Sequence, residues 1–249
     1  MLTHPTADRL RSLRLRAMAD AYLAQHQDPA RLAMDFDERL ACLVDAEHLS
    51  RENRKLARYL KEAKLRIGQA CLEDLDYAPR RELDRALIRQ LATGHWILEH
   101  RNVLITGQTG VGKTYVACAL GQLACRHGYR AVYRRLSRLF QELALARADG
   151  SYPTLLARLA RVDCLILDDW GLGTLTEMQR HDLLEVIEDR DAARSTVIAS
   201  QLAPDDWHAY LAEPTIADAV LDRLVHNAYT MTLKGPSRRK EKADTTTDR

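Results

Sequence analysis

Residues 102–114 read NVLITGQTGVGKT, and this stretch decides the fold. Its first part, residues 102–106, is a short apolar run rich in β-branched side chains, which predicts a buried strand. Residues 107–114 then fit the pattern G-x-x-x-x-G-K-[ST] at every fixed position. A helix is expected over 115–127, with Gly128 as its stop. A strand, a glycine-rich loop and a helix in this order predict a phosphate-binding loop and argue against a chance match.

The residue types of this loop suit phosphate binding. Glycine adopts backbone conformations that a Cβ forbids, so successive N–H groups can turn inward around an anion. Lys113 is expected to reach the β- and γ-phosphates of ATP, and the Thr114 hydroxyl is expected to ligate Mg²⁺. The following helix adds the positive end of its dipole. The expected contacts to the nucleotide come from Gly107, Gln108, Thr109, Gly110, Val111, Gly112, Lys113, Thr114 and Tyr115.

A second apolar run, residues 162–167, ends in two carboxylates and has the pattern of a Walker B strand. Asp168 is expected to hold the Mg²⁺ shell, and Asp169 is placed to polarise a water for in-line attack on the γ-phosphate. Paired acids at a strand end can also cap the following turn, here residues 170–173. After a complete phosphate-binding loop, the metal-binding interpretation is favoured.

Two further elements supply polar candidates. Residues 195–199 predict a strand whose carboxyl end brings Ser200 and Gln201 beside the phosphates. Either side chain could sense the γ-phosphate or position the attacking water, or could simply form a turn. A helix expected over 216–226 turns its apolar side to the core, which leaves Arg223 free to point outward. Such an arginine is ordinary surface in a monomer, but it becomes an arginine finger if subunits pack head to tail.

The expected fold class is α/β, a P-loop fold with a parallel five-stranded sheet flanked by helices. Its other two strands are expected over 131–133 and 229–233. No glycine precedes Gly68, and helical periodicity over 8–27 and 35–67 predicts a separate, all-helical module. The expected organisation is a helical domain over 1–72, an ATPase domain over 73–242 and a disordered tail over 243–249.

Cationic residues cluster at two places. The second expected helix carries basic residues at spacings of three or four, Arg54 and Arg58 among them, and Arg134, Arg135 and Arg138 gather where the second strand meets its helix. Such clusters can follow the phosphate backbone of DNA. They can equally be solvated surface, because acidic residues nearly balance the charge.

Composition narrows the class of protein without naming a partner. The 249 residues suffice for one α/β domain and a smaller unit. A formal net charge of +2 is too near zero to indicate nucleic acid by itself. The five cysteines are far apart in the sequence, which favours buried, reduced thiols over a metal site. Because no apolar run is long enough for a signal peptide or a membrane span, a cytoplasmic protein is expected.

These motifs together resemble those of the additional-strand P-loop ATPases, the AAA+ class, and specifically the IstB-like transposition helper ATPases, which are similar to DnaC-type helicase loaders. The resemblance covers most of the chain, including the helical leader. Beyond the phosphate-binding loop it rests on LILDDWG at 165–171, TVIASQ at 196–201, DRLVHNA at 222–228 and LKGPSRRK at 233–240.

The resemblance implies an ATP-dependent regulator of DNA transposition. Such a protein would assemble head to tail on double-stranded DNA, present the target to the transposase encoded by the same element, and hydrolyse ATP. The implied roles are nucleotide and Mg²⁺ ligands for Lys113 and Thr114, the metal-shell acid for Asp168, sensor 1 for Ser200 or Gln201, the arginine finger for Arg223, and the sensor-2 arginine for Arg238 or Arg239.

One departure and several alternatives accompany this resemblance. Most AAA+ ATPases have glutamate where this chain has Asp169, and the shorter side chain predicts slower or more partner-dependent hydrolysis. A replicative helicase loader shares the same core, and gene neighbourhood would separate the two functions. A small-molecule P-loop kinase would need an acceptor pocket and a mobile lid, and neither is visible in the sequence. A DNA-binding scaffold with a vestigial nucleotide site is disfavoured, because the lysine, threonine and both acids are present.

Overall fold

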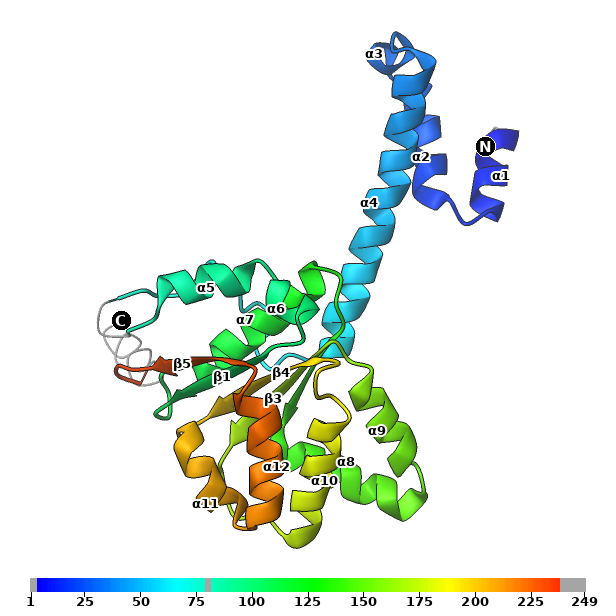
Figure 1. The fold of residues 1–249 in the computed structure, drawn as a ribbon. Helices are drawn as coiled ribbons and strands as arrows, with labels where there is room; N and C mark the ends of the chain where they lie inside the picture. The colour runs from blue at the N-terminus through cyan, green and yellow to red at the C-terminus, as the bar shows by residue number, and fades with distance from the viewer. Residues whose placement is uncertain (1–3, 79–81, 238–249) are drawn as a thin grey trace, which may run out of the picture. The chain divides into compact units, whose positions relative to one another are not determined.

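The computed structural model describes residues 4–78 and 82–237 (Figure 1). Five strands form one sheet in the order β2-β3-β4-β1-β5, and every neighbouring pair is parallel. The strands are β1 (Asn102–Gly107), β2 (Ala131–Arg135), β3 (Cys164–Trp170), β4 (Ser195–Ser200) and β5 (Ala228–Leu233). The predicted α/β fold with five parallel strands is therefore confirmed.

Helices cover both faces of this sheet. In Figure 1, α7 lies on one face together with α5 and α6, whereas α8, α10 and α12 lie on the other. The helices of this part of the chain are α5 (Arg85–Ala92), α6 (His95–Leu98), α7 (Lys113–Arg126), α8 (Leu136–Asp149), α9 (Tyr152–Ala160), α10 (Glu177–Glu188), α11 (Trp207–Leu211) and α12 (Pro214–Val225), with a short 3-10 turn, η2, at Pro204–Asp206.

The alternation of side chains along each strand builds a core on both faces of the sheet. Leu104, Leu165 and Ile198 pack into the cluster that includes buried residues of α8, α10 and α12. On the opposite face, α7 approaches the sheet closely at Gly121, where a Cβ would collide with the Ile166 side chain. This close approach fixes the helix that follows the phosphate-binding loop against the centre of the sheet.

A buried arginine ties the ends of several elements together at the amino-terminal edge of the central strands. Arg190 is 1% exposed. Its guanidinium donates hydrogen bonds to the carbonyl oxygens of Leu159, Val162 and Ser195 and to the Thr196 hydroxyl. Burial lowers the pKa of Arg190 to about 10, so the charge is retained at neutral pH while the guanidinium satisfies carbonyls that would otherwise lack donors.

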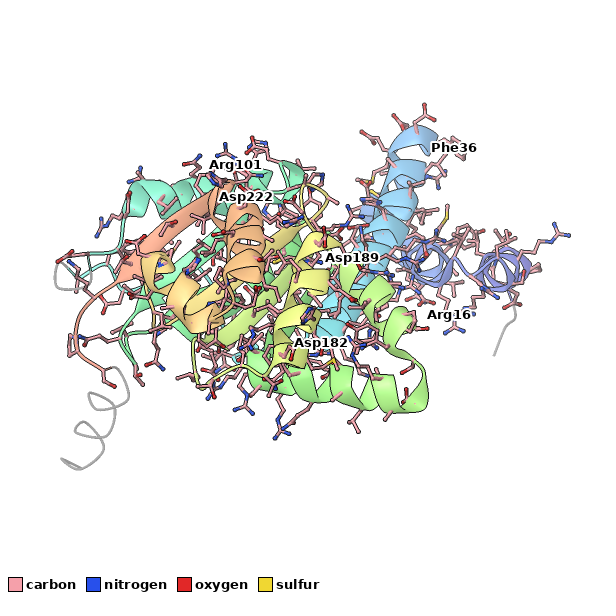
Figure 2. All side chains as sticks on the ribbon, turned by 60° about the horizontal axis from the view of Figure 1, so that its bottom comes forward. Arg16, Phe36, Arg101, Asp182, Asp189 and Asp222 are labelled. Carbon is pink, nitrogen blue, oxygen red and sulfur yellow. The ribbon has the colours of Figure 1, made fainter. Side chains whose placement is uncertain are left out.

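The chain divides by its contacts into two compact units, residues 1–58 and 59–249. The first unit contains α1 (Pro5–Ser12), α2 (Arg16–Gln25), α3 (Pro29–Leu32) and most of α4 (Phe36–Ala63), with Arg16 and Phe36 marked in Figure 2. The division lies inside α4 rather than at the expected boundary of 72/73. Residues 59–72 go with the sheet-bearing unit because Ala63, Ala70 and Leu72 are buried there.

The single helix expected over 8–27 is wrong, because the chain breaks between α1 and α2. Arg14 has a φ of +62°, a left-handed conformation that ends a helix. The new helix is then stabilised at its start by Glu47 of α4, whose carboxylate accepts hydrogen bonds from the backbone N–H groups of Ala17 and Met18. An acid placed at a helix N-terminus satisfies donors that have no partner within the helix.

Within residues 4–78 and 82–237, each helix is either too short or too polar to cross a membrane. The expected tail, residues 243–249, lies outside the part of the chain that the structure describes.

Candidate nucleotide-binding site

The loop between β1 and α7 has the backbone of an anion-binding cradle. Gly107, Gly110 and Gly112 have φ values of +140°, +88° and +110°, which residues with a Cβ rarely adopt. A Cβ would also collide with the Leu233 carbonyl oxygen at Gly107 and with Ser237 at Gly110. The loop leads directly into α7, whose first residue is Lys113. Free N–H groups at this helix start favour a bound phosphate.

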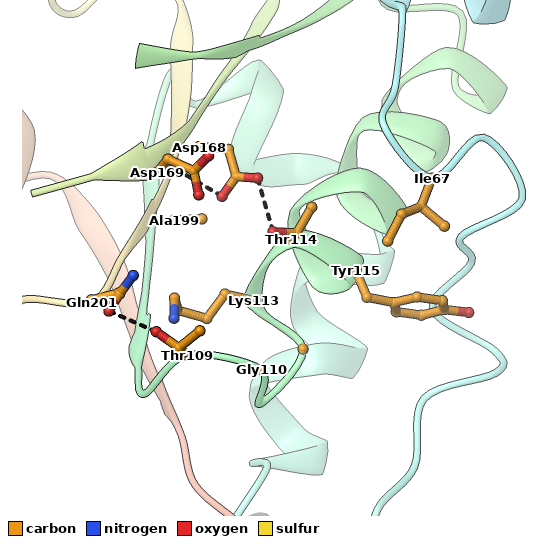
Figure 3. Close-up of a pocket in the computed structure, with 11 residues that line it drawn as sticks. Ile67, Thr109, Gly110, Lys113, Thr114, Tyr115, Asp168, Asp169, Ala199 and Gln201 are labelled. Atoms are coloured by element: carbon orange, nitrogen blue, oxygen red, sulfur yellow. Dashed lines mark hydrogen bonds between the residues drawn. The ribbon is translucent and has the colours of Figure 1, made fainter. Parts of the chain in front are cut away.

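Lys113 brings a positive charge into this cradle. Its side chain is 9% exposed, and its ammonium group donates to the carbonyl oxygens of Gly107 at 2.7 Å and Gln108 at 2.9 Å. Figure 3 places the lysine inside the loop, with its ammonium end toward Gln201. A largely buried cation held by neutral carbonyls is well placed to attract a phosphate.

Thr114 and Asp168 meet at the point where α7 faces the end of β3. The Thr114 hydroxyl donates to Asp168 Oδ2 at 2.8 Å (Figure 3). Both groups are oxygen ligands of the kind that Mg²⁺ prefers. Among the described residues, no cluster of three or more His, Cys, Asp or Glu side chains could hold a metal ion. A Mg²⁺ ion here would therefore need phosphate oxygens and water to complete its shell, which is how Mg²⁺ commonly binds beside nucleotides.

Asp168 has additional partners that the sequence motifs did not indicate. The Tyr133 hydroxyl on β2 donates to Asp168 Oδ2 at 2.7 Å, and Arg66 Nη1 lies 3.9 Å from the same oxygen. Burial and the bond to Asp168 raise the pKa of Tyr133 well above its usual value. A hydrogen bond to Tyr133 raises the pKa of Arg66. The sequence placed Tyr133 in a strand, but no short motif links that strand to the acid or to Arg66.

Asp169 owes its position to an irregularity in β3. The pairing of β3 with β4 shifts register between Leu167 and Trp170, and Asp169 there has a φ of +62°. The extra residue of such a bulge turns a side chain away from the regular alternation. Asp169 consequently lines the same pocket as Asp168 and Lys113. Aspartate tolerates the left-handed conformation better than most residues, which offers a physical reason for Asp at this position.

The geometry separates the two candidates at the end of β4. Gln201 lines the pocket, and its Oε1 accepts a hydrogen bond from the Thr109 hydroxyl at 2.8 Å (Figure 3). Ser200 is buried instead, and its hydroxyl bonds with the Trp170 carbonyl and the Leu202 N–H. Gln201, which directly follows the last residue of β4, is therefore the candidate of the two that faces the pocket.

The resulting pocket has a volume of about 280 Å³, close to the lower end of the range for ligand sites. Ile67 and Tyr115 form apolar wall, and Thr109, Gly110, Gly112, Lys113 and Thr114 contribute the loop side. Of the other expected contacts, Val111 lies at a smaller neighbouring cavity, while Gly107 and Gln108 face Lys113 through their carbonyls. The candidate sensor-2 residues Arg238 and Arg239 lie outside the described residues.

Arg223 does not line this pocket, and its outward side chain is paired on its own subunit. It donates to Glu188 Oε1 of α10 at 2.9 Å and to the Ala219 carbonyl at 2.8 Å, and it is 24% exposed. The Asn102 side chain donates to the Arg223 carbonyl at 3.0 Å, which fixes the end of α12 to the start of β1. Arg223 is thus held in one place at the surface.

The cationic candidates differ in their availability. Arg54 and Arg58 line a hollow of the first unit together with Arg14, Arg51, Glu52 and Lys55. Arg51 and Arg54 also lie 2.8 and 3.4 Å from a Glu47 carboxylate oxygen. Arg134 is 12% exposed and pairs with Glu142 at 2.9 Å, so its charge is already engaged. Arg135 is half-buried, and Arg138 is exposed and donates to Gln141.

The parallel sheet with the order β2-β3-β4-β1-β5, the glycine-rich loop after β1 and the acids after β3 define a P-loop ATPase fold of the AAA+ class. Within that class, the chain belongs to the family of IstB-like ATP binding proteins, whose profile matches residues 8–246. The family resemblance of the sequence motifs is confirmed.

Relatives and solved structures agree with this placement. An insertion sequence ATP-binding protein of Sinorhizobium fredii is 49% identical over 240 residues, which span 96% of this chain and 98% of that protein. The insertion sequence IS1162 ATP-binding protein of Pseudomonas fluorescens is 52% identical over 202 residues, covering 81% of this chain and 87% of that one.

Two solved structures are similar in fold. AMPPCP-bound DnaA from Aquifex aeolicus has a TM-score of 0.59 at 18% identity, over 75% of this chain and 57% of that one. The DnaC helicase loader has a TM-score of 0.54 at 18% identity, over 66% of this chain and 97% of that one. At such identities the likeness establishes the fold alone.

Proposed function

We propose that the protein is an ATPase that regulates DNA transposition by assembling on target DNA and recruiting the transposase of its own element. The convergence of Lys113, Thr114, Asp168 and Asp169 on one pocket, in a chain of an insertion-sequence family, carries this proposal. The P-loop binds the phosphates of ATP, and hydrolysis converts the protein to a state that binds DNA and the transposase differently.

Each residue of the pocket has a defined task in this reaction. Lys113 stabilises the negative charge of the β- and γ-phosphates, and Thr114 and Asp168 hold the metal shell. Mg²⁺, when bound, neutralises charge that develops on the phosphate oxygens. Asp169 accepts the proton of the attacking water, and Gln201 orients that water or hydrogen-bonds to the γ-phosphate. Because Asp169 is one methylene shorter than glutamate, the intrinsic rate is low and depends on the assembly.

Arg223 completes the site of a neighbouring subunit. It lies outside the pocket of its own chain, and Glu188 and the Asn102 contact hold it at a fixed surface position. In a head-to-tail assembly of identical subunits, one subunit's fixed surface arginine can face the pocket of the next. The guanidinium would then leave or share Glu188 to stabilise the transferred phosphoryl group.

Double-stranded DNA binds through the cationic hollow of the first unit. The hollow is lined by Arg14, Arg51, Arg54, Lys55 and Arg58, with Glu52 as an acid among them. Exposed arginines in a concave arrangement suit contacts to phosphates, which carry little sequence information. We therefore expect binding with weak sequence preference and a steep dependence on salt.

Reconstituted strand transfer tests the proposal. The neighbouring transposase, a donor end and target duplex are combined with this protein and ATP, and products are counted with wild type and with Lys113→Ala. The proposal predicts ATP-dependent stimulation that Lys113→Ala loses. Arg126→Ala, which removes an exposed cation of α7 paired with Glu73, serves as the matched control and retains activity. Equal product with and without this protein would exclude the transposition role, and stimulation of a replicative helicase instead would favour the loader.

A further inference from the structure

Three residues from separate parts of the sheet-bearing unit converge on one carboxylate beneath the pocket. Asp168 Oδ2 accepts from both Thr114 and Tyr133, at 2.8 and 2.7 Å. Asp168 Oδ1 accepts from the backbone N–H of Asp169 at 2.9 Å. Arg66 approaches within 3.9 Å of Oδ2. The carboxylate is 2% exposed, so its orientation is set by these protein partners rather than by water.

The hydrogen bond between Tyr133 and Asp168 determines the direction of the tyrosine proton. A guanidinium has donors and no acceptor, whereas a phenol has one proton and an oxygen that also accepts. An ionised carboxylate only accepts, so the single Tyr133 proton points at Asp168 Oδ2, 2.7 Å away. The Tyr133 oxygen keeps its acceptor capacity for the Arg66 guanidinium, whose pKa the tyrosine raises. This arrangement holds the carboxylate in one orientation with Thr114, the other residue expected at the metal.

We propose that Tyr133 and Arg66 are positioning residues that set the affinity of the Thr114 and Asp168 pair for Mg²⁺. The inference rests on the proposed function, in which those two side chains hold the ion. Groups that hydrogen-bond to a metal-binding side chain orient it, and their removal commonly costs about 10- to 100-fold in metal affinity. Tyr133 stands in this relation to Asp168 and appears in none of the motifs that mark the site.

Arg66 also connects the ion to the segment that follows α4. The helix ends at Ala63, and Lys64 has a φ of +50°, so Arg66 reaches the site from a turn. Mg²⁺ and the guanidinium are both attracted to the same carboxylate. Binding of the ion therefore weakens the Arg66 contact and loosens residues 64–68. The nucleotide state of the pocket is thus transmitted to the chain that joins α4 to the ATPase fold.

Metal titration of nucleotide binding tests the positioning role. Binding of a fluorescent, non-hydrolysable ATP analogue is followed as Mg²⁺ is raised from zero in a chelating buffer. Tyr133→Phe removes the hydroxyl and keeps the ring, so the Mg²⁺ concentration for half-maximal effect should rise about 10-fold, while affinity without Mg²⁺ stays unchanged. Tyr152→Phe is the matched control, because Tyr152 also donates to a buried aspartate, Asp182, at 2.7 Å, away from the pocket.

The possible outcomes distinguish failure of the positioning role from failure of the proposed metal site. A midpoint in Tyr133→Phe that equals wild type, or an equal shift in Tyr152→Phe, would overturn the positioning role while the metal site stands. If the affinity of the wild-type protein for the nucleotide analogue does not depend on Mg²⁺, both the metal site and the positioning role are overturned. Hydrogen exchange across residues 64–68 tests the transmission. Mg²⁺ added to the analogue complex should raise exchange in wild type, and the same rise in Tyr133→Phe should need about 10-fold more Mg²⁺. Exchange over residues 64–68 that does not change with Mg²⁺ in wild type would contradict the transmission.

Discussion

Arg190→Met should strongly destabilise the sheet-bearing unit without altering the nucleotide-binding pocket. The substitution removes hydrogen bonds to three carbonyl oxygens and one hydroxyl, each worth roughly 1.5–3 kcal/mol from a charged donor. Opposing this loss, burial of the guanidinium is itself costly, as its lowered pKa of about 10 indicates. The expected net effect is about 3–5 kcal/mol, comparable with breaking a buried ion pair.

Urea unfolding followed by tryptophan fluorescence measures the stability of the sheet-bearing unit. All three tryptophans, Trp96, Trp170 and Trp207, lie in the sheet-bearing unit. Arg158→Met, which removes an exposed arginine of α9, is the control and should change stability by less than about 0.5 kcal/mol. A loss below about 1 kcal/mol in Arg190→Met would refute the reasoning, since it would mean that the carbonyls find other donors.

Three further predictions concern catalysis, DNA and pH. Asp169→Asn should bind ATP almost normally while hydrolysis falls, because the base is lost and no phosphate contact is removed; an equal loss of binding in equilibrium titrations would contradict the assignment. Charge reversal of Arg54 and Arg58 should reduce the slope of log affinity for duplex DNA against log salt, and an unchanged slope would leave the hollow as solvated surface. Hydrogen bonds from Arg51 and from the start of α2 lower the pKa of Glu47. The stabilisation that this carboxylate gives to α2 is therefore complete above the unfolded pKa near 4.5 and is lost as the pH falls through the folded pKa. Intrinsic-rate-corrected hydrogen exchange over residues 16–25 should therefore rise on acidification below about pH 5, and Glu47→Gln should flatten that dependence; equal pH profiles would argue against the role of Glu47.

The sequence predicts the sheet and the phosphate-binding loop well, because their signals are contiguous. Residues 102–114 contain the strand, the three glycines and the start of the helix in one run, so local rules suffice. The five strands were likewise visible as apolar runs, and the structure differs mainly at their ends. The pattern places Gln201 and Ser200 side by side, and only their contacts separate them: Ser200 bonds to Trp170 and Leu202, whereas Gln201 faces the pocket.

What the sequence missed depends on contacts between distant segments. The break at Arg14 is favoured by the Glu47 carboxylate, which lies two helices later and caps α2. The pairing of Arg223 with Glu188 joins α12 to α10, and a periodicity argument cannot reveal the acid. Arg66 and Tyr133 reach Asp168 from a turn and from a neighbouring strand, and no fixed spacing in the chain marks such a convergence.

Mixing two inactive variants on DNA tests the central claim most directly. Arg223→Ala should bind ATP but lose hydrolysis by roughly 10³- to 10⁵-fold, the range known for arginine fingers, and Lys113→Ala should fail to bind ATP tightly. At a mixed interface, the intact pocket of the first meets the intact arginine of the second, so DNA-stimulated hydrolysis should return when the two are combined. If no ratio restores hydrolysis although both variants assemble together on DNA, the active site is not shared between subunits and the account is contradicted.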